Sequence, residues 1–183
     1  MNSVVRSVVV AGMLGAVAIL LAVTRLGMIP MPTGVNATIM HIPAILGGVV
    51  EGPGVGALVG LIFGLYSFLY SGRFFADPLV SILPRLLIGP AAYYVRRATG
   101  SVALAAALGT ATNTVGVLGM AVLRGYLPAK AAGVIALTHG LPEMVVAVVL
   151  VVPIARALAR WRGGHSPAAA AAVRKRREQG EKT

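Results

Sequence analysis

Four titratable residues lie inside long apolar stretches of this sequence, and their types make them the first candidates for chemistry. They are His41, Arg85, His139 and Glu143. Ionisable groups in apolar segments are costly and therefore rare, so each one indicates a binding site or a structural ion pair. His139 and Glu143 are four residues apart, a spacing that places both side chains on one face of a helix.

These residues permit two interpretations. Arg85 and Glu143 can form a buried ion pair that only fixes packing, while Asn113 and nearby threonines make hydrogen bonds between helices. Alternatively, the polar groups line a pocket for a small polar solute, in which the planar donors of Arg85 bind an acidic group. We favour the pocket, and the residues that we predict to line it are Asn36, His41, Asp77, Arg85, Asn113, His139 and Glu143.

Catalytic motifs find no match in this sequence. It contains no HExxH, GxSxG or GxxxxGK[ST] motif, no paired-aspartate cluster of the lipid-headgroup transferase kind, and no cysteine. Two histidines and one glutamate on different apolar stretches are a weak signal for a metal site. We therefore predict a protein that is not an enzyme and that uses no metal or other cofactor.

The elements that position these residues are transmembrane helices. Of 183 residues, 57% are hydrophobic and only 11% are charged, a composition outside the range of soluble domains. A bilayer core requires about 20 apolar residues per helix, with breaks at Gly, Pro and charges. The sequence thus predicts an all-α integral membrane protein of six transmembrane helices. The predicted spans are 8–27, which we expect to be retained and not cleaved as a signal peptide, 35–50, 54–71, 78–95, 101–123 and 132–158.

The distribution of Lys and Arg predicts the orientation, because cationic loops resist translocation. Six spans place both termini on one side. That side carries Arg6, Arg96, Arg97, Arg156, Arg160 and Arg162, together with five cations of the tail, whereas the other side carries Arg25, Arg73, Arg124 and Lys130. We therefore expect both termini in the cytoplasm. Arg85 lies eight residues after Asp77, about 12 Å deeper along a helix, so the polar cluster belongs to the outer half of the membrane.

We divide the chain into a six-helix domain over residues 1–162 and a basic tail over 163–183, which we expect to be disordered and to touch anionic lipid. The net charge of +11 does not indicate nucleic acid as a partner, because no basic folded module accompanies it.

Small residues recur at helical spacing. Gly56, Gly60 and Gly64 repeat every four residues, which predicts close contact between helices. The first span carries a face of small residues as well. That face either packs on another helix of the same chain or docks a separate membrane subunit, and the sequence does not choose between them.

Several segments, taken in order, resemble the substrate-specific S components of energy-coupling factor (ECF) transporters over residues 5–158. They are Asn36-Ala-Thr-Ile-Met-His-Ile-Pro-Ala-Ile-Leu-Gly-Gly, Glu51-Gly-Pro-Gly-Val-Gly-Ala-Leu-Val-Gly, Asp77-Pro-Leu-Val-Ser-Ile-Leu-Pro-Arg85, Thr112-Asn113-Thr114 and His139-Gly-Leu-Pro-Glu143. The resemblance implies a six-helix protein of the prokaryotic cytoplasmic membrane that captures a vitamin or related micronutrient from outside. It also implies that ATP is hydrolysed only by partner subunits.

The resemblance extends to a lid and to partners. It implies that the loop after the first helix, Met28 to Val35, covers the site, with Pro30 and Pro32 stiffening it. It further implies an EcfT-like membrane coupling subunit and two EcfA-like ATPase subunits. The first-helix residues expected to dock the coupling subunit are Ala11, Gly15, Ala18 and Ala22.

The ligand is less well defined by the sequence. Arg85 in a polar, weakly aromatic cavity favours pantothenate or a pyrimidine or pyridine type of vitamin over bulky cobalamin, and leaves riboflavin and folate open. Two alternatives from other classes stay open as well. One is a self-contained secondary transporter or channel for a small polar solute, and the other is a structural membrane subunit.

Overall fold

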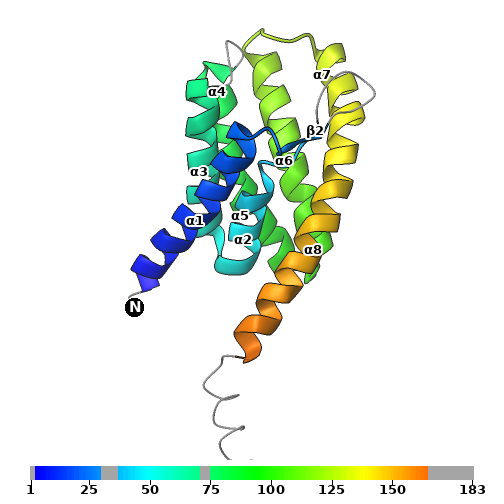
Figure 1. Cartoon of the computed structure of the whole chain (residues 1–183). Coiled ribbons are helices and arrows are strands. Elements are labelled where there is room, and N and C mark those ends of the chain that lie inside the picture. Colours follow the sequence, from blue (N-terminus) through cyan, green and yellow to red (C-terminus); the bar gives the residue numbers. More distant parts are fainter. Residues whose placement is uncertain (1–2, 30–36, 71–74, 165–183) are drawn as a thin grey trace, which may run out of the picture.

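The computed structural model describes residues 3–29, 37–70 and 75–164, and nearly all of them are helical (Figure 1). The helices are α1 Ser3–Val23, α2 Ile42–Glu51, α3 Pro53–Tyr70, α4 Pro78–Ser81, α5 Leu83–Thr99, α6 Val102–Leu123, α7 Ala129–Ile135, the π-helical turn η2 Ala136–Gly140, and α8 Leu141–Gly164. The strands β1 Met28–Ile29 and β2 Ala37–Thr38 form an antiparallel pair.

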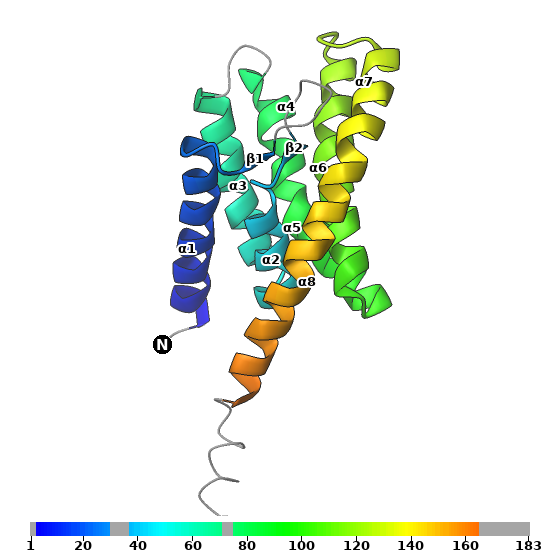
Figure 2. The same ribbon diagram turned by 45° about the vertical axis from the view of Figure 1, so that its right-hand side comes forward.

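Five helical segments are long and apolar enough to cross a membrane. They are Val4–Val23, Pro53–Tyr70, Pro78–Thr99, Val102–Leu123 and Ala129–Trp161. Together with the shorter α2 they form the expected six-helix membrane bundle, which confirms the predicted fold class. The first turn of α1 and the last turns of α8 lie at the same end of the bundle (Figures 1 and 2).

The second predicted span, 35–50, is wrong in extent. Helix α2 has ten residues, about 15 Å of rise against a bilayer core of about 30 Å. The chain before it forms the β1–β2 pair, in which Met28 lies opposite Thr38. The helix begins at Ile42 with a proline in its first turn, because Pro43 fits a helix start but not its interior. Apolar composition alone does not distinguish a helix buried in protein from one that spans lipid.

The fourth predicted span, 78–95, is divided in the structure. Helix α4 ends at Ser81 and α5 begins at Leu83 with a proline in its first turn. Since Pro84 has no N–H to donate, the helical ladder is interrupted just before Arg85. Helix α5 then continues to Thr99 and ends at Gly100, whose left-handed φ of 70° suits glycine.

The half of the bundle that contains the start of α1 and the end of α8 is a packed apolar core. It contains nearly all of α2 together with Val59 of α3, Ile88 of α5 and Val151 of α8, which are fully buried, and the buried members of the cluster are at most 8% exposed. Glycine permits close packing here, because a Cβ on Gly56 would lie 2.7 Å from the Cα atoms of both Gly48 and Gly89. This contact agrees with the close packing predicted for the glycine face of α3.

The small face of α1, which we predicted to dock the coupling subunit, points into the bundle in this chain. Ala11, Ala18 and Ala22 are 3%, 0% and 7% exposed. A Cβ on Gly15 would lie 2.6 Å from Cδ1 of Ile62, so this face packs against α3. Small side chains allow any helix to approach closely, so their spacing could not distinguish a helix of the same chain from a partner. The exposed face of α1 carries larger apolar side chains, among them Val8, Met13, Val17 and Leu20, and also the small residues Gly12 and Ala16.

Candidate solute-binding site

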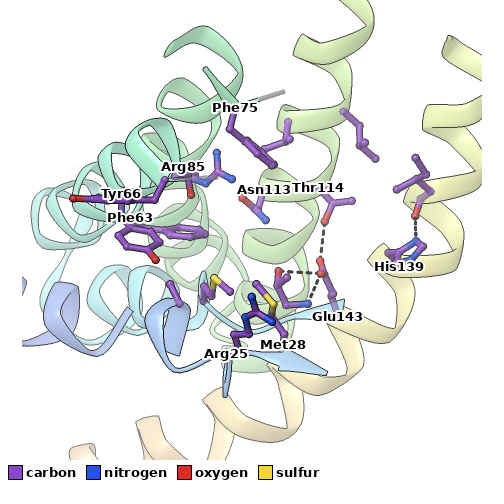
Figure 3. A pocket seen from close by; sticks show the side chains of 18 of the residues that line it. Arg25, Met28, Phe63, Tyr66, Phe75, Arg85, Asn113, Thr114, His139 and Glu143 are labelled. Atoms are coloured by element: carbon purple, nitrogen blue, oxygen red, sulfur yellow. Dashed lines mark hydrogen bonds between the residues drawn. The ribbon is translucent and has the colours of Figure 1, made fainter. Parts of the chain in front are cut away.

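A cavity of about 850 Å³ occupies the half of the bundle opposite the apolar core. Its volume lies within the range of small-molecule sites. Figure 3 shows side chains from several helices converging on it. The lining residues are Ala22, Val23, Arg25, Met28, Thr38, Met40, Phe63, Tyr66, Ser67, Tyr70, Phe75, Arg85, Asn113, Thr114, Val117, Leu118, Ile135, His139 and Glu143.

Arg85 is the buried cation of this cavity, at 5% exposure. Its Nη1 donates a hydrogen bond to the carbonyl oxygen of Ser81, one turn earlier. Its guanidinium carbon lies 4.8 Å from the ring centre of Phe63 and 4.9 Å from that of Phe75, so two aromatic faces stabilise the charge. Its Nε has no partner among the described residues. Arg85 therefore keeps a donor for a solute.

Glu143 is the acceptor of the cavity and joins three elements. Its Oε1 accepts hydrogen bonds from the backbone N–H and the hydroxyl of Thr38, at 2.7 and 3.1 Å. Its Oε2 accepts from the Thr114 hydroxyl at 3.3 Å. Among the described residues, Glu143 and Arg85 form no ion pair with each other. The interpretation as a purely structural ion pair is therefore not supported, although both residues line one cavity as expected.

Asn113 and His139 add two more polar groups to the lining. Each side chain belongs to a residue that is 8% exposed, from α6 and η2 respectively. Within the described part of the chain, Oδ1 of Asn113 and Nε2 of His139 have no hydrogen-bond partner. Buried polar atoms normally are paired, so these two unpaired atoms are candidates for hydrogen bonds to a polar solute.

His41, which we predicted as a pocket residue, lies outside this lining. It is fully buried, and its Nε2 lies 3.0 Å from the hydroxyl of Thr110. This pair joins the start of α2 to α6 beneath the cavity. Burial in an apolar stretch was predicted from the sequence, but the partner of the ring was not.

Asp77 also lies outside the lining and has a structural role. Its Oδ1 accepts from the backbone N–H of Leu79, which caps α4. Its Oδ2 accepts from Nε of Arg124 at 2.6 Å and from the hydroxyl of Tyr126 at 3.2 Å. The Arg124 guanidinium holds the pKa of the Asp77 carboxyl below its ordinary value. The sequence Asp77-Pro78 indicated the capping role, since aspartate is a preferred N-cap and proline a preferred first helical residue.

Three residues of the predicted site and its lid, Asn36, Pro30 and Pro32, lie outside the described residues, and so does the predicted tail beyond residue 164. Met28, the first residue of the predicted lid, is described, and it lines the cavity.

Comparison with known proteins decides what kind of protein this geometry belongs to. The sequence profile of the family described as "ECF transporter, substrate-specific component" matches residues 6–155. This chain belongs to that family. The S component is also 32% identical over 160 residues to the pantothenic acid transporter PanT of Lactococcus lactis subsp. cremoris (strain MG1363), with 72% of this chain and 82% of PanT covered.

Family membership confirms several predictions about the S component. It is a transporter subunit of the cytoplasmic membrane with several transmembrane helices, and it is not itself an enzyme. The family also implies a vitamin-type ligand and an ECF module as partner. The cavity in the half opposite the apolar core is the natural candidate for the ligand site.

The sequence analysis did not predict the aromatic residues that line the cavity of this S component. Phe63, Tyr66 and Tyr70 line the cavity from α3, and the rings of Tyr66 and Tyr70 stack with centres 5.1 Å apart. Their spacing of three and four residues is the signal that places them on one helix face. Arg25 was also missed. It lines the cavity from the turn after α1, in a left-handed conformation with φ 57°, a conformation that sequence spacing does not reveal.

Proposed function

We propose that this S component captures pantothenate in the cavity around Arg85, from the outer side of the membrane, and delivers it to an ATP-driven ECF module. The observation that carries the proposal is the chemical polarity of the cavity. Arg85 offers hydrogen-bond donors and a positive charge, while Glu143, on a different helix, offers a carboxylate that accepts. In Figure 3 the two side chains lie apart, with Asn113 between them.

Pantothenate matches this polarity. It carries a carboxylate at one end, two hydroxyl groups at the other, and an amide between them. Carboxylate binds guanidinium in a planar, two-pronged geometry that lysine cannot reproduce. The hydroxyl hydrogens suit the acceptors around Glu143. The similarity to a relative named as a pantothenic acid transporter supports the same ligand.

The arrangement of the bundle supports capture followed by assisted delivery. The described cavity opens in one half of the bundle, and the apolar cluster around Ile45 and Ile88 fills the other half. A conduction path would need polar groups along the whole thickness of the membrane. A closed apolar half therefore favours an S component that depends on a coupling subunit and two ATPase subunits over a self-contained channel. The excess of Lys and Arg on the side of the chain ends supports cytoplasmic termini and an outward-facing site.

Binding of pantothenate to the purified protein tests the ligand. Isothermal titration with wild-type protein is compared with Arg85→Ala and Arg85→Lys. We expect Arg85→Ala to weaken binding about tenfold to a hundredfold, the value of a hydrogen bond to a charged group, and Arg85→Lys to recover only part of it. Arg97→Ala is the matched control, because Arg97 lies on the same helix and is exposed outside the cavity. Folded wild-type protein that binds no pantothenate would refute this ligand.

Uptake into vesicles tests the coupling. We expect radiolabelled pantothenate to accumulate only when the coupling and ATPase subunits are co-expressed and ATP is supplied. Accumulation by the S component alone would instead support a self-contained transporter.

A further inference from the structure

His139 lies at a local change in helix type. The segment from Ala129 to Gly164 is helical throughout, but Ala136–Gly140 form a π turn between α7 and α8. A π turn contains one extra residue, so it changes the direction in which its side chains point, and such turns are frequent at functional sites. His139 is in this turn, lines the cavity, and is 8% exposed.

The hydrogen-bond partners of the ring determine which nitrogen carries the proton. Nδ1 of His139 lies 3.3 Å from the carbonyl oxygen of Ile135 and 2.8 Å from the hydroxyl oxygen of Thr138. A carbonyl oxygen only accepts. The Thr138 hydroxyl donates its hydrogen to the carbonyl of Val134 at 2.9 Å, so its oxygen is an acceptor toward the ring. Both partners require Nδ1 to be the donor.

The other nitrogen follows from this assignment. In a neutral imidazole with the hydrogen on Nδ1, Nε2 carries a lone pair and accepts. Nε2 of His139 is buried and has no partner among the described residues. A residue that lines the cavity thus holds an unpaired acceptor, on the same helical segment as the Glu143 carboxylate. In Figure 3 a dashed line marks the contact of His139 Nδ1 with the carbonyl oxygen of Ile135, and the Glu143 side chain lies nearby.

We propose that His139 is a specificity-determining residue: its Nε2 accepts a hydrogen bond from a hydroxyl or amide N–H of the solute. The π turn sets the direction of the His139 side chain, and the partners of Nδ1 fix the hydrogen on that nitrogen. The inference rests on the proposed function, and it deepens it by defining the solute class as carboxylates that carry a hydrogen-bond donor at the far end. A solute with only acceptors there would face the lone pair of Nε2 and the carboxylate of Glu143 without a hydrogen to share.

Paired ligands test this role. Binding of pantothenate and of its two mono-deoxy analogues, each lacking one hydroxyl, is measured for wild-type protein, His139→Leu and His41→Gln. We expect wild-type protein to bind one of the analogues about tenfold more weakly than pantothenate, because one hydrogen bond is lost. His139→Leu should bind pantothenate and that analogue equally. His41→Gln is the matched control and should keep the tenfold ratio, since His41 is a buried histidine outside the lining.

Other results would overturn the inference. Equal binding of all three ligands by wild-type protein, or an undiminished ratio in His139→Leu, would assign the hydroxyl to another partner. The tautomer is tested without any ligand or cavity variant, by ¹⁵N NMR of histidine-labelled wild-type protein. The chain has three histidines, so His41→Gln and His165→Gln spectra identify the signals of His139.

We expect a pyrrole-type signal for Nδ1 of His139 and a pyridine-type signal for Nε2. A proton on Nε2 would refute the acceptor role even if His139→Leu does not fold. If folded wild-type protein binds no pantothenate, the proposed ligand fails, whereas the acceptor role of His139 is still decided by the NMR spectrum.

Discussion

Glu143 of α8 accepts two hydrogen bonds from one residue, Thr38 of β2: one from the backbone N–H at 2.7 Å and one from the hydroxyl at 3.1 Å. The two residues are 105 positions apart in sequence. This double contact attaches the β1–β2 pair to α8 at the edge of the cavity. The strand pair is thereby positioned by the same carboxylate that we assign to solute binding.

Removing the Thr38 hydroxyl should weaken this attachment. Thr38→Val keeps the backbone hydrogen bond and the size of the side chain but loses the second contact, so we expect a loss of about 1 kcal/mol in the free energy of unfolding. The measurement is thermal or denaturant unfolding in detergent. Thr112→Val is the control, because the Thr112 hydroxyl donates to the carbonyl of Leu108 within its own helix. Equal losses of unfolding free energy in the two variants would show that the hydrogen bond from Thr38 to Glu143 does not stabilise the fold more than a hydrogen bond within one helix.

Gly60 should be intolerant of any side chain. A Cβ at this position would collide with the carbonyl oxygen of Arg85, so Gly60→Ala must push α5 away from α3 at the residue that we propose to bind the solute. We expect a loss of roughly 1–3 kcal/mol in stability and weaker pantothenate binding. Gly54→Ala, on the same helix, is the control, since a Cβ there meets nothing within 4 Å. Unchanged stability and binding in Gly60→Ala would contradict the close packing.

The ion pair of Asp77 and Arg124 predicts a dependence of stability on acid. The pKa of Asp77 is lowered in the folded protein by its hydrogen bond to Arg124, so the unfolded chain takes up this proton first. The stabilisation is therefore complete above about pH 4, the ordinary pKa of aspartate, and is lost as the pH falls through the lower folded value. Melting temperatures between about pH 6 and 3 should decline more steeply for wild type than for Asp77→Asn. Parallel curves would argue against the pair.

The buried face of α1 predicts contrasting effects for two nearby residues. Ala18 is fully buried beside Met40 and Phe63, so Ala18→Leu should destabilise the isolated subunit by roughly 1–3 kcal/mol. Gly12→Leu should not, because a Cβ on Gly12 has no neighbour within 4 Å. Unfolding of the S component purified without partners measures both. Equal stability of both variants would show that Ala18 does not lie in a packed contact.

The sequence predicted the membrane bundle because each span leaves a recognisable apolar run between Gly, Pro and charges. It also predicted that Arg85 and Glu143 share a cavity, since a charge in an apolar run needs a polar surrounding. It could not predict that His41 and Asp77 lie outside that cavity. A polar residue in an apolar stretch is expected to be buried, but the sequence does not show which side chain it will contact. The direction of the His139 side chain depends on the π turn, which contains one extra residue. Neither the apolar periodicity nor the composition of the sequence predicts such a turn.

The brevity of α2 has a consequence for how cargo moves. Ten residues reach only about half of the way through the hydrocarbon layer, and the apolar side chains around them form a floor under the cavity. A solute that rests on this floor cannot continue in a straight line to the opposite compartment. The cavity is thus closed on the side of the chain ends, and a solute bound in it can reach that side only if the protein changes its conformation or its orientation.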